Sequence, residues 1–185
     1  MPIKSILLIW VMVILQSCGQ DTHIRTYRIA KPKPPDTAPR DEAPDTNSAG
    51  FSWKKPESWI PSSGSSMRLA SFDIPYSEGS GDLSVIQLGG TGGGIEANVN
   101  RWRRQLNLEP QSLSKIEKEM IEKRGGLGVY NIIRIINEEM DSAFLCAILT
   151  AGNQTLFVKL SANPPGIREI EADFILFCSS LKISI

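Results

Sequence analysis

The chain has 185 residues with 20 basic and 20 acidic side chains, so its formal net charge is zero, and 41% of its residues are hydrophobic. This balance lacks the basic excess that draws proteins to nucleic acid, and we expect no nucleic-acid partner. The single histidine, His23, lies outside the part of the chain with a hydrophobic period, which excludes Ser-His-Asp and Cys-His sites from that part. No Cys-x-x-Cys motif is present either, so we expect no metal and no cofactor.

The N-terminus has a pattern typical of exported proteins. Lys4 precedes an apolar run at 6–15, which is too short to span a bilayer but has the length of a secretory signal core. The next residues, Leu15-Gln16-Ser17-Cys18-Gly19, resemble the bacterial lipobox. This resemblance implies cleavage before Cys18 and acylation of its thiol, and several buried acyl chains give stable membrane attachment. The alternative is an ordinary signal peptide with an incidental cysteine.

These features predict a signal peptide over residues 1–17 and a lipidated tether over residues 18–49. The tether contains five prolines and no hydrophobic period, a composition typical of a disordered spacer. Gly19 follows the cysteine, where an Asp would resemble an inner-membrane retention signal. We therefore expect a lipid-anchored envelope protein, in the outer membrane facing the periplasm or at the cell surface.

Residues 50–185 are expected to form one domain, since this length suits a single hydrophobic core. The domain has 14 basic and 15 acidic side chains, a formal charge of −1. A strand is predicted at 67–75, where alternation puts Ser71 and Asp73 on one side and Arg68 on the other. A Gly/Ser-rich turn at 77–81 leads to a second strand at 83–88, and together they predict a β-hairpin.

A glycine-rich segment at 89–94 joins this hairpin to a predicted helix. Its residues 92–97 fit the G-x-G-x-x-A spacing of a dinucleotide loop. Such a loop also needs a parallel βαβ unit, and Glu96 places negative charge where a phosphate would bind. The pattern therefore favours a tight turn that packs the helix closely against the sheet.

The helix predicted at 95–106 has one apolar and one polar stripe. The apolar stripe follows helical spacing and consists of Ile95, Val99, Trp102 and Leu106. The polar stripe consists of Asn98, Arg101 and Gln105, which are the candidate binding residues because an arginine with amides can bind a carboxylate-bearing ligand or partner. In the structural alternative, which we favour, Arg101 bridges the helix to a neighbouring loop.

A second, short helix is predicted from Ser114, whose Ser-Lys-Ile-Glu sequence fits a capping box, to Lys123. Strands at 128–136, 143–150 and 155–162 follow, joined by short turns. A final amphipathic helix begins at the Pro164 pair, and its apolar residues are Ile167, Ile170, Phe174, Phe177 and Leu181. Helices before and after a meander predict the α+β class, with an α/β/α sandwich around a largely antiparallel sheet.

Two further groups of residues leave alternatives open. Cys146 and Cys178 form a disulfide or stay as free buried thiols. Glu138, Glu139 and Asp141 solvate a turn, which we favour, or supply the acid and base of a carboxylate-based hydrolase of envelope polymers. No catalytic residue is assigned.

Several phrases of the domain resemble an uncharacterised family of small secreted bacterial lipoproteins. They are WKKPESW at 53–59, MRLASF at 67–72, NVNRWRRQ at 98–105, FVKL at 157–160 and the spaced phenylalanines at 174–181. The predicted strand order is also similar to the PsbP-like fold, which includes the photosystem subunit PsbP and the Ran-binding Mog protein. The resemblance implies a non-catalytic binding or assembly module whose partner is an envelope protein or polymer. A purely structural envelope protein is a further alternative.

Overall fold

The computed structural model describes residues 50–184, and the predicted signal peptide, tether and lipid site at Cys18 lie outside the described residues. Seven strands form one sheet in the order β2-β3-β4-β8-β7-β6-β5, with every neighbouring pair antiparallel. The strands are β2 (Ile60–Pro61), β3 (Arg68–Tyr76), β4 (Gly79–Gly89), β5 (Ile121–Gly125), β6 (Gly128–Asn137), β7 (Ser142–Ala151) and β8 (Gln154–Ala162). The predicted hairpin is β3–β4, and the predicted meander is β6–β7–β8.

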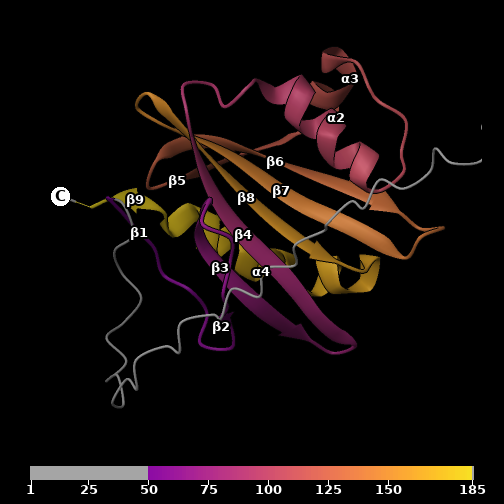
Figure 1. The fold of residues 1–185 in the computed structure, drawn as a ribbon, viewed down its shortest axis with the longest axis horizontal. Coiled ribbons are helices and arrows are strands. Elements are labelled where there is room, and N and C mark those ends of the chain that lie inside the picture. The colour runs from indigo at the N-terminus through magenta and orange to yellow at the C-terminus, as the bar shows by residue number, and fades with distance from the viewer. Residues whose placement is uncertain (1–49, 185) are drawn as a thin grey trace, which may run out of the picture. The chain divides into compact units, whose positions relative to one another are not determined.

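Helices lie on both sides of this sheet. Helices α2 (Ile95–Gln105) and α3 (Leu113–Glu119) lie on one side and α4 (Pro164–Ser180) on the other (Figure 1). The predicted α/β/α sandwich of the α+β class is therefore confirmed. Helix α4 begins where expected, because Pro164 suits the first helical position and the Asn163 side chain accepts a hydrogen bond from the Gly166 N–H at 2.8 Å. Within residues 50–184 no helix is both long and apolar enough to cross a membrane.

The core beneath α4 extends across most of the sheet. Strands β3, β4, β6, β7 and β8 all contribute buried side chains to it, among them Phe72, Leu83, Tyr130, Leu145 and Leu156. Phe177 of α4 packs against Trp59 and Phe72, with ring centroids 5.1 and 5.8 Å apart. These aromatic contacts fix α4 against the hairpin end of the sheet.

The core beneath α2 and α3 is smaller. Its buried members are Val99, Trp102, Leu106, Ile116, Ile133, Ile135, Phe144, Cys146 and Phe157. Among the described residues, β3 contributes no side chain to this cluster, and Leu88 is the only residue of β4 that packs against it. The α2–α3 layer therefore covers the β6–β8 part of the sheet and does not reach the β3–β4 part of the same face. On that part Ser71 and Ser84 are nevertheless buried, and Gly64 packs closely against Ser71 and Arg68.

The segment after α3 differs from the sequence prediction. Helix α3 ends at Glu119, and residues 121–125 form the edge strand β5 instead of continuing the helix to Lys123. Its N-cap is Ser112 and not Ser114, and no side chain caps it. The helix ends early because residues 121–125 form a hairpin with β6, from Ile121↔Ile132 to Gly125↔Gly128, and this pairing replaces the helical hydrogen bonds of the segment.

A β-bulge changes the sidedness of β3. The register shifts between Arg68 and Ala70, so Arg68 lies on the same face as Ser71, contrary to the predicted alternation. A bulge inserts one extra residue and thereby re-aims the side chains that precede it. Arg68 consequently reaches groups on the solvent-facing part of the sheet.

The two ends of the described chain lie side by side. Strand β1 (Phe51–Ser52) pairs with β9 (Lys182–Ile183) in a separate two-stranded sheet. The Ser184 N–H also donates to the Gly50 carbonyl at 2.8 Å. The chain thus enters the domain next to the point where it leaves.

Candidate functional site

Asn98, the first predicted binding residue, is used inside the domain. Its side chain belongs to a residue that is only 2% exposed, and its Nδ2 donates to the carbonyls of Gly92 at 2.9 Å and Gly94 at 2.7 Å. Asn98 therefore ties the glycine-rich loop to the first turns of α2.

Arg101 joins the same network. Its exposed guanidinium donates from Nη2 to Asn98 Oδ1 at 2.7 Å, so the amide of Asn98 is satisfied at both ends. Arg101 thus contacts a residue of its own helix, and the direct contact between the helix and the loop is made by Asn98. Gln105, by contrast, lies one turn further along α2 and contacts Lys159 of β8 instead of the glycine-rich loop.

The glycine-rich loop forms a close turn. Gly90, Gly92, Gly93 and Gly94 all have φ between +56° and +89°. The N–H groups of Gly92 and Gly94 donate to the carbonyls of Gly89 and Thr91 within the turn. A Cβ on Gly92 would lie 2.5 Å from the Phe157 ring, so the loop packs directly on the sheet. The strand before it, β4, has antiparallel neighbours on both sides, which differs from the parallel unit of a dinucleotide site.

We name the β2–β4 part of the sheet face that α2 and α3 do not cover, together with the adjoining end of β8, the open face. Residues that pair across antiparallel strands point to the same side, as Asp73, Asp82 and Ser161 do. The open face consists of Ile60, Arg68, Ser71, Asp73, Asp82, Ser84, Lys159 and Ser161. Ile60 is the one apolar residue of this set, and it is 55% exposed.

An ion pair orders the centre of the open face. Arg68 donates from Nη1 and Nη2 to the two carboxylate oxygens of Asp82, at 2.9 and 3.1 Å, and from Nη1 to Ser71 Oγ at 3.3 Å. The hydrogen bonds to Asp82 raise the pKa of Arg68. This bidentate geometry joins β3 to β4 and neutralises both charges.

Lys159 lies where α2 ends and the open face begins. Its Nζ is 4.3 Å from the centre of the Phe144 ring and donates to Gln105 Oε1 at 3.1 Å. Burial lowers the pKa of Lys159, as does nearby Arg68, while Cys146 and Asp82 act in the opposite direction. Within residues 50–184 the structure gives Lys159 no ion pair with a carboxylate. The ammonium group is thus held by an aromatic ring and a neutral amide.

Sequence reasoning identified Gln105 but missed Lys159. In its strand, Leu156, Val158 and Leu160 point into the α4 core, so Phe157 and Lys159 share the other side. A lysine within the apolar run Leu156–Leu160, two residues from a large aromatic side chain, is the signal that could have indicated a half-buried cation.

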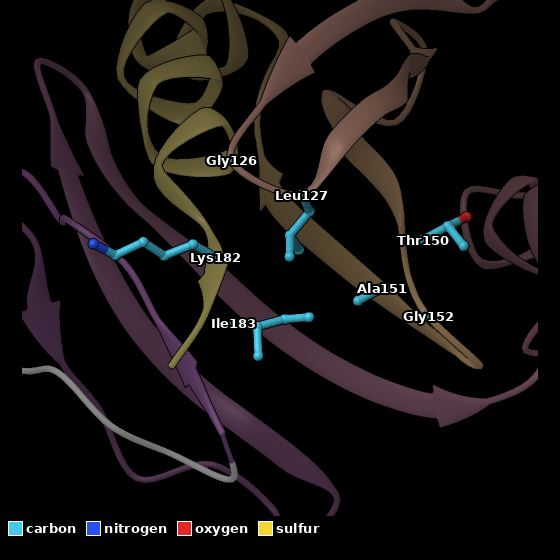
Figure 2. A pocket seen from close by; sticks show the side chains of 7 residues that line it. All are labelled: Gly126, Leu127, Thr150, Ala151, Gly152, Lys182 and Ile183. Atoms are coloured by element: carbon cyan, nitrogen blue, oxygen red, sulfur yellow. The ribbon is translucent and has the colours of Figure 1, made fainter. Parts of the chain in front are cut away.

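A separate groove lies near the chain ends. It has a volume of about 450 Å³ and is lined by Gly126, Leu127, Thr150, Ala151, Gly152, Lys182 and Ile183. Figure 2 shows Leu127, Ala151 and Ile183 around the hollow, with the amino end of Lys182 directed away from it. The seven lining residues include no carboxylate and so supply no acid–base pair.

The carboxylates of Glu138, Glu139 and Asp141 are exposed in the turn between β6 and β7. Asn137 closes this turn by accepting hydrogen bonds from the N–H groups of Glu139 and Met140, at 3.0 and 3.2 Å. None of the three carboxylates lines the groove. Among residues 50–184, no three His, Cys, Asp or Glu side chains are grouped so as to hold a metal ion.

The disulfide alternative is wrong for this structure. Cys146 and Cys178 are free and belong to different cores, one beneath α2 and one beneath α4. The sheet itself separates the two thiols. Burial raises the pKa of both, so both are stabilised as neutral thiols.

No family model and no curated protein matches this chain. Solved structures with a similar fold include a Bacteroides thetaiotaomicron VPI-5482 protein, with 12% identity and a TM-score of 0.47, covering 74% of this chain and 46% of that one. They also include the cyanobacterial PsbP (CyanoP) of Synechocystis sp. PCC 6803, with 17% identity, a TM-score of 0.47 and coverage of 72% and 86%.

A third similar structure is LpqN of Mycobacterium tuberculosis, described as involved in cell envelope biogenesis. Its identity is 10%, its TM-score 0.39 and its coverage 73% of this chain and 83% of its own. This chain spans less than half the length of the Bacteroides protein. At these similarities none of the three assigns a ligand or an active residue to this chain.

Proposed function

We propose that this domain is a non-catalytic binding module, held at a membrane of the bacterial envelope by a lipid on Cys18, whose protein partner docks on the open face. The incomplete helix layer carries this proposal. Helix α4 packs over its side of the sheet from β3 to β6, whereas α2 and α3 do not reach the β3–β4 part of the other side. An envelope polymer is the alternative partner.

The chemistry of the open face supports docking of a protein. Ile60 offers an exposed apolar side chain, and on the same face Arg68 of β3 is already ordered by three hydrogen bonds, two to Asp82 and one to Ser71. Protein interfaces combine an apolar centre with a polar rim. Side chains that are fixed before binding lose less conformational entropy when a partner arrives.

Site-specific photocrosslinking in cells tests the docking surface. Benzoylphenylalanine is introduced into the full chain in place of Ile60 on the open face or Leu176 on α4. These residues are similarly exposed, at 55% and 65%, and lie on opposite sides of the sheet, which makes position 176 a matched control. We expect a discrete crosslinked species from position 60 alone, and mass spectrometry then identifies the partner.

Two outcomes contradict the docking proposal. Equal crosslinking from positions 60 and 176 would show that contact depends on exposure and not on the open face. A product from position 60 that resists protease but is shortened by cell-wall hydrolases would replace the protein partner with a polymer.

The lipid anchor requires its own test, because Cys18 lies outside the described residues. Cells that express the full chain or its Cys18→Ser variant are grown with radioactive palmitate. We expect label on the unchanged chain and none on the variant, since serine has no thiol to form the thioether with the lipid. Equal labelling of both chains would rule out acylation at this residue.

A further inference from the structure

We infer that Lys159 and Gln105 form a binding site for a single carboxylate group on a peptide segment of the partner. This inference rests on the proposed docking at the open face, and it names the chemistry recognised there.

The ammonium group of Lys159 has no carboxylate partner among the described residues. The ion pairs described in residues 50–184 join Arg68 to Asp82 and Arg134 to Glu171, and neither includes Lys159. Among the described residues its Nζ contacts neutral groups, the Phe144 ring at 4.3 Å and Gln105 Oε1 at 3.1 Å, while the nearby Asp82 carboxylate is already bound by Arg68. An ammonium group that is partly removed from water gains more from an anion than one in bulk solvent.

The side chains of Gln105 and Lys159 place two hydrogen-bond donors close together. Gln105 uses Oε1 to accept from Lys159, and among the described interactions its Nε2 makes no hydrogen bond. The amide nitrogen and the ammonium group therefore provide two donors at one place. A carboxylate has two oxygens that accept such donors together.

The charges around Lys159 favour a ligand with a single negative charge. Asp73 and Asp82 lie on the same face as Lys159, and Arg68 is neutralised by Asp82. A polyanion would be repelled by these carboxylates, whereas one negative charge is matched by one ammonium group. The site therefore fits a monoanion better than a phosphate-rich chain.

Apolar side chains near Lys159 favour a peptide as the carrier of the carboxylate. Ile86, which pairs with Phe157, is half-buried beside this site, and Ile60 is exposed on the same face. An apolar side chain next to a glutamate would contact Ile86 while the carboxylate binds Lys159, whereas Ile60, three strands from β8, would be reached only by a longer segment of the same partner. A carbohydrate acid has no comparable apolar groups.

The test uses the full-length chain, purified in detergent and labelled with ¹³C and ¹⁵N. The probe is the peptide N-acetyl-leucyl-glutamyl-leucine amide, and its matched control carries glutamine in place of glutamate. We expect the glutamate peptide to shift the Gln105 side-chain amide and the Lys159 ε-methylene signals saturably, with about tenfold higher affinity than the glutamine peptide.

Titration of Lys159 gives a second readout. Burial lowers its pKa in the free protein, with Asp82, Cys146 and Arg68 as the nearby charged or titratable groups. A bound carboxylate stabilises the ammonium form, so the pKa of Lys159 must rise when the glutamate peptide is present. The glutamine peptide should leave it unchanged.

Variants identify the residues responsible. Lys159→Met should weaken the glutamate peptide about tenfold, and Gln105→Leu should weaken it by a smaller factor. Lys118→Met, at an exposed lysine of α3, is the matched control and should bind as the unchanged chain does. If Lys159→Met fails to fold, as judged by near-UV circular dichroism, Gln105→Leu decides, because Gln105 is exposed at the end of α2.

Three results would overturn the carboxylate site: equal affinity for the two peptides, unchanged binding in both variants, or tighter binding of inorganic phosphate at the same signals. Crosslinking from position 60 without peptide binding would overturn this site and leave the docking proposal intact. Peptide binding without crosslinking would do the reverse.

Discussion

The side-chain hydrogen bonds of Asn98, which was predicted to bind a partner molecule, are all made to residues of the domain itself. Its amide satisfies two loop carbonyls and receives one bond from Arg101. Buried polar groups contribute little when paired but are costly when a partner is removed. The residue is therefore structural, and its loss should affect folding before it affects binding.

The corresponding prediction concerns stability. Asn98→Ala should lower the free energy of unfolding by about 1 to 3 kcal/mol, because the Gly92 and Gly94 carbonyls lose their donor. Arg101→Ala, at an exposed residue, should change it by about 0.5 kcal/mol or less. Urea denaturation of both variants measures the difference. Similar values for the two variants would contradict the role assigned to Asn98.

Sequence spacing predicted the residues of α2 but not the direction of each polar side chain. Helical period separates the apolar stripe from its neighbours, yet Asn98 lies close to that stripe and turns inward toward the loop. The same helical period places Gln105 in the polar stripe and so makes it a candidate binding residue. Its contact with Lys159 depends on where β8 passes α2, which local sequence does not contain.

At the scale of elements, the glycine loop shows two separable requirements for glycine. Gly90 and Gly92 have similar positive φ values, 56° and 61°. A Cβ on Gly90 would meet nothing within 4 Å, whereas one on Gly92 would lie 2.5 Å from the Phe157 ring. The first glycine is required by backbone conformation alone, and the second by conformation and space together.

Alanine substitutions at these glycines should separate the two costs. Gly90→Ala should destabilise the domain by about 1 kcal/mol, the cost of a left-handed conformation for a residue with a Cβ. Gly92→Ala should cost about 1 to 3 kcal/mol more, because the Phe157 ring must move. Thermal or urea unfolding of the two variants provides the measurement. Equal destabilisation would show that the ring yields without cost.

Elements with a long periodic pattern were predicted well, and short ones at the edge were not. The stripe that ends at Leu181 predicted α4 from its prolines onward, and three strand-like runs joined by short turns predicted the meander. Strand β5 has only five residues, of which three are charged, and its extended form depends on pairing with β6. A local rule cannot detect such a partner.

At the scale of the whole molecule, the unequal helix layers determine which surface is available. The hairpin joins the meander through the pairing of β4 with β8, residues about eighty positions apart such as Leu83 and Leu160. This pairing extends the sheet beyond the reach of the two short helices α2 and α3. The open face is thus a product of topology, and no single segment of the sequence predicts it.

The pairing of β1 with β9 has a mechanical consequence for a protein held by its N-terminus. A pull transmitted through Gly50 loads the Ser184–Gly50 bond and the β1–β9 pairing from one end, so these bonds open one after another. Opening this short pair releases a few residues of chain without breaking a hydrogen bond of the seven-stranded sheet, because the two sheets share no strand. We therefore expect β1 and β9 to separate at a lower force than the seven-stranded sheet unfolds.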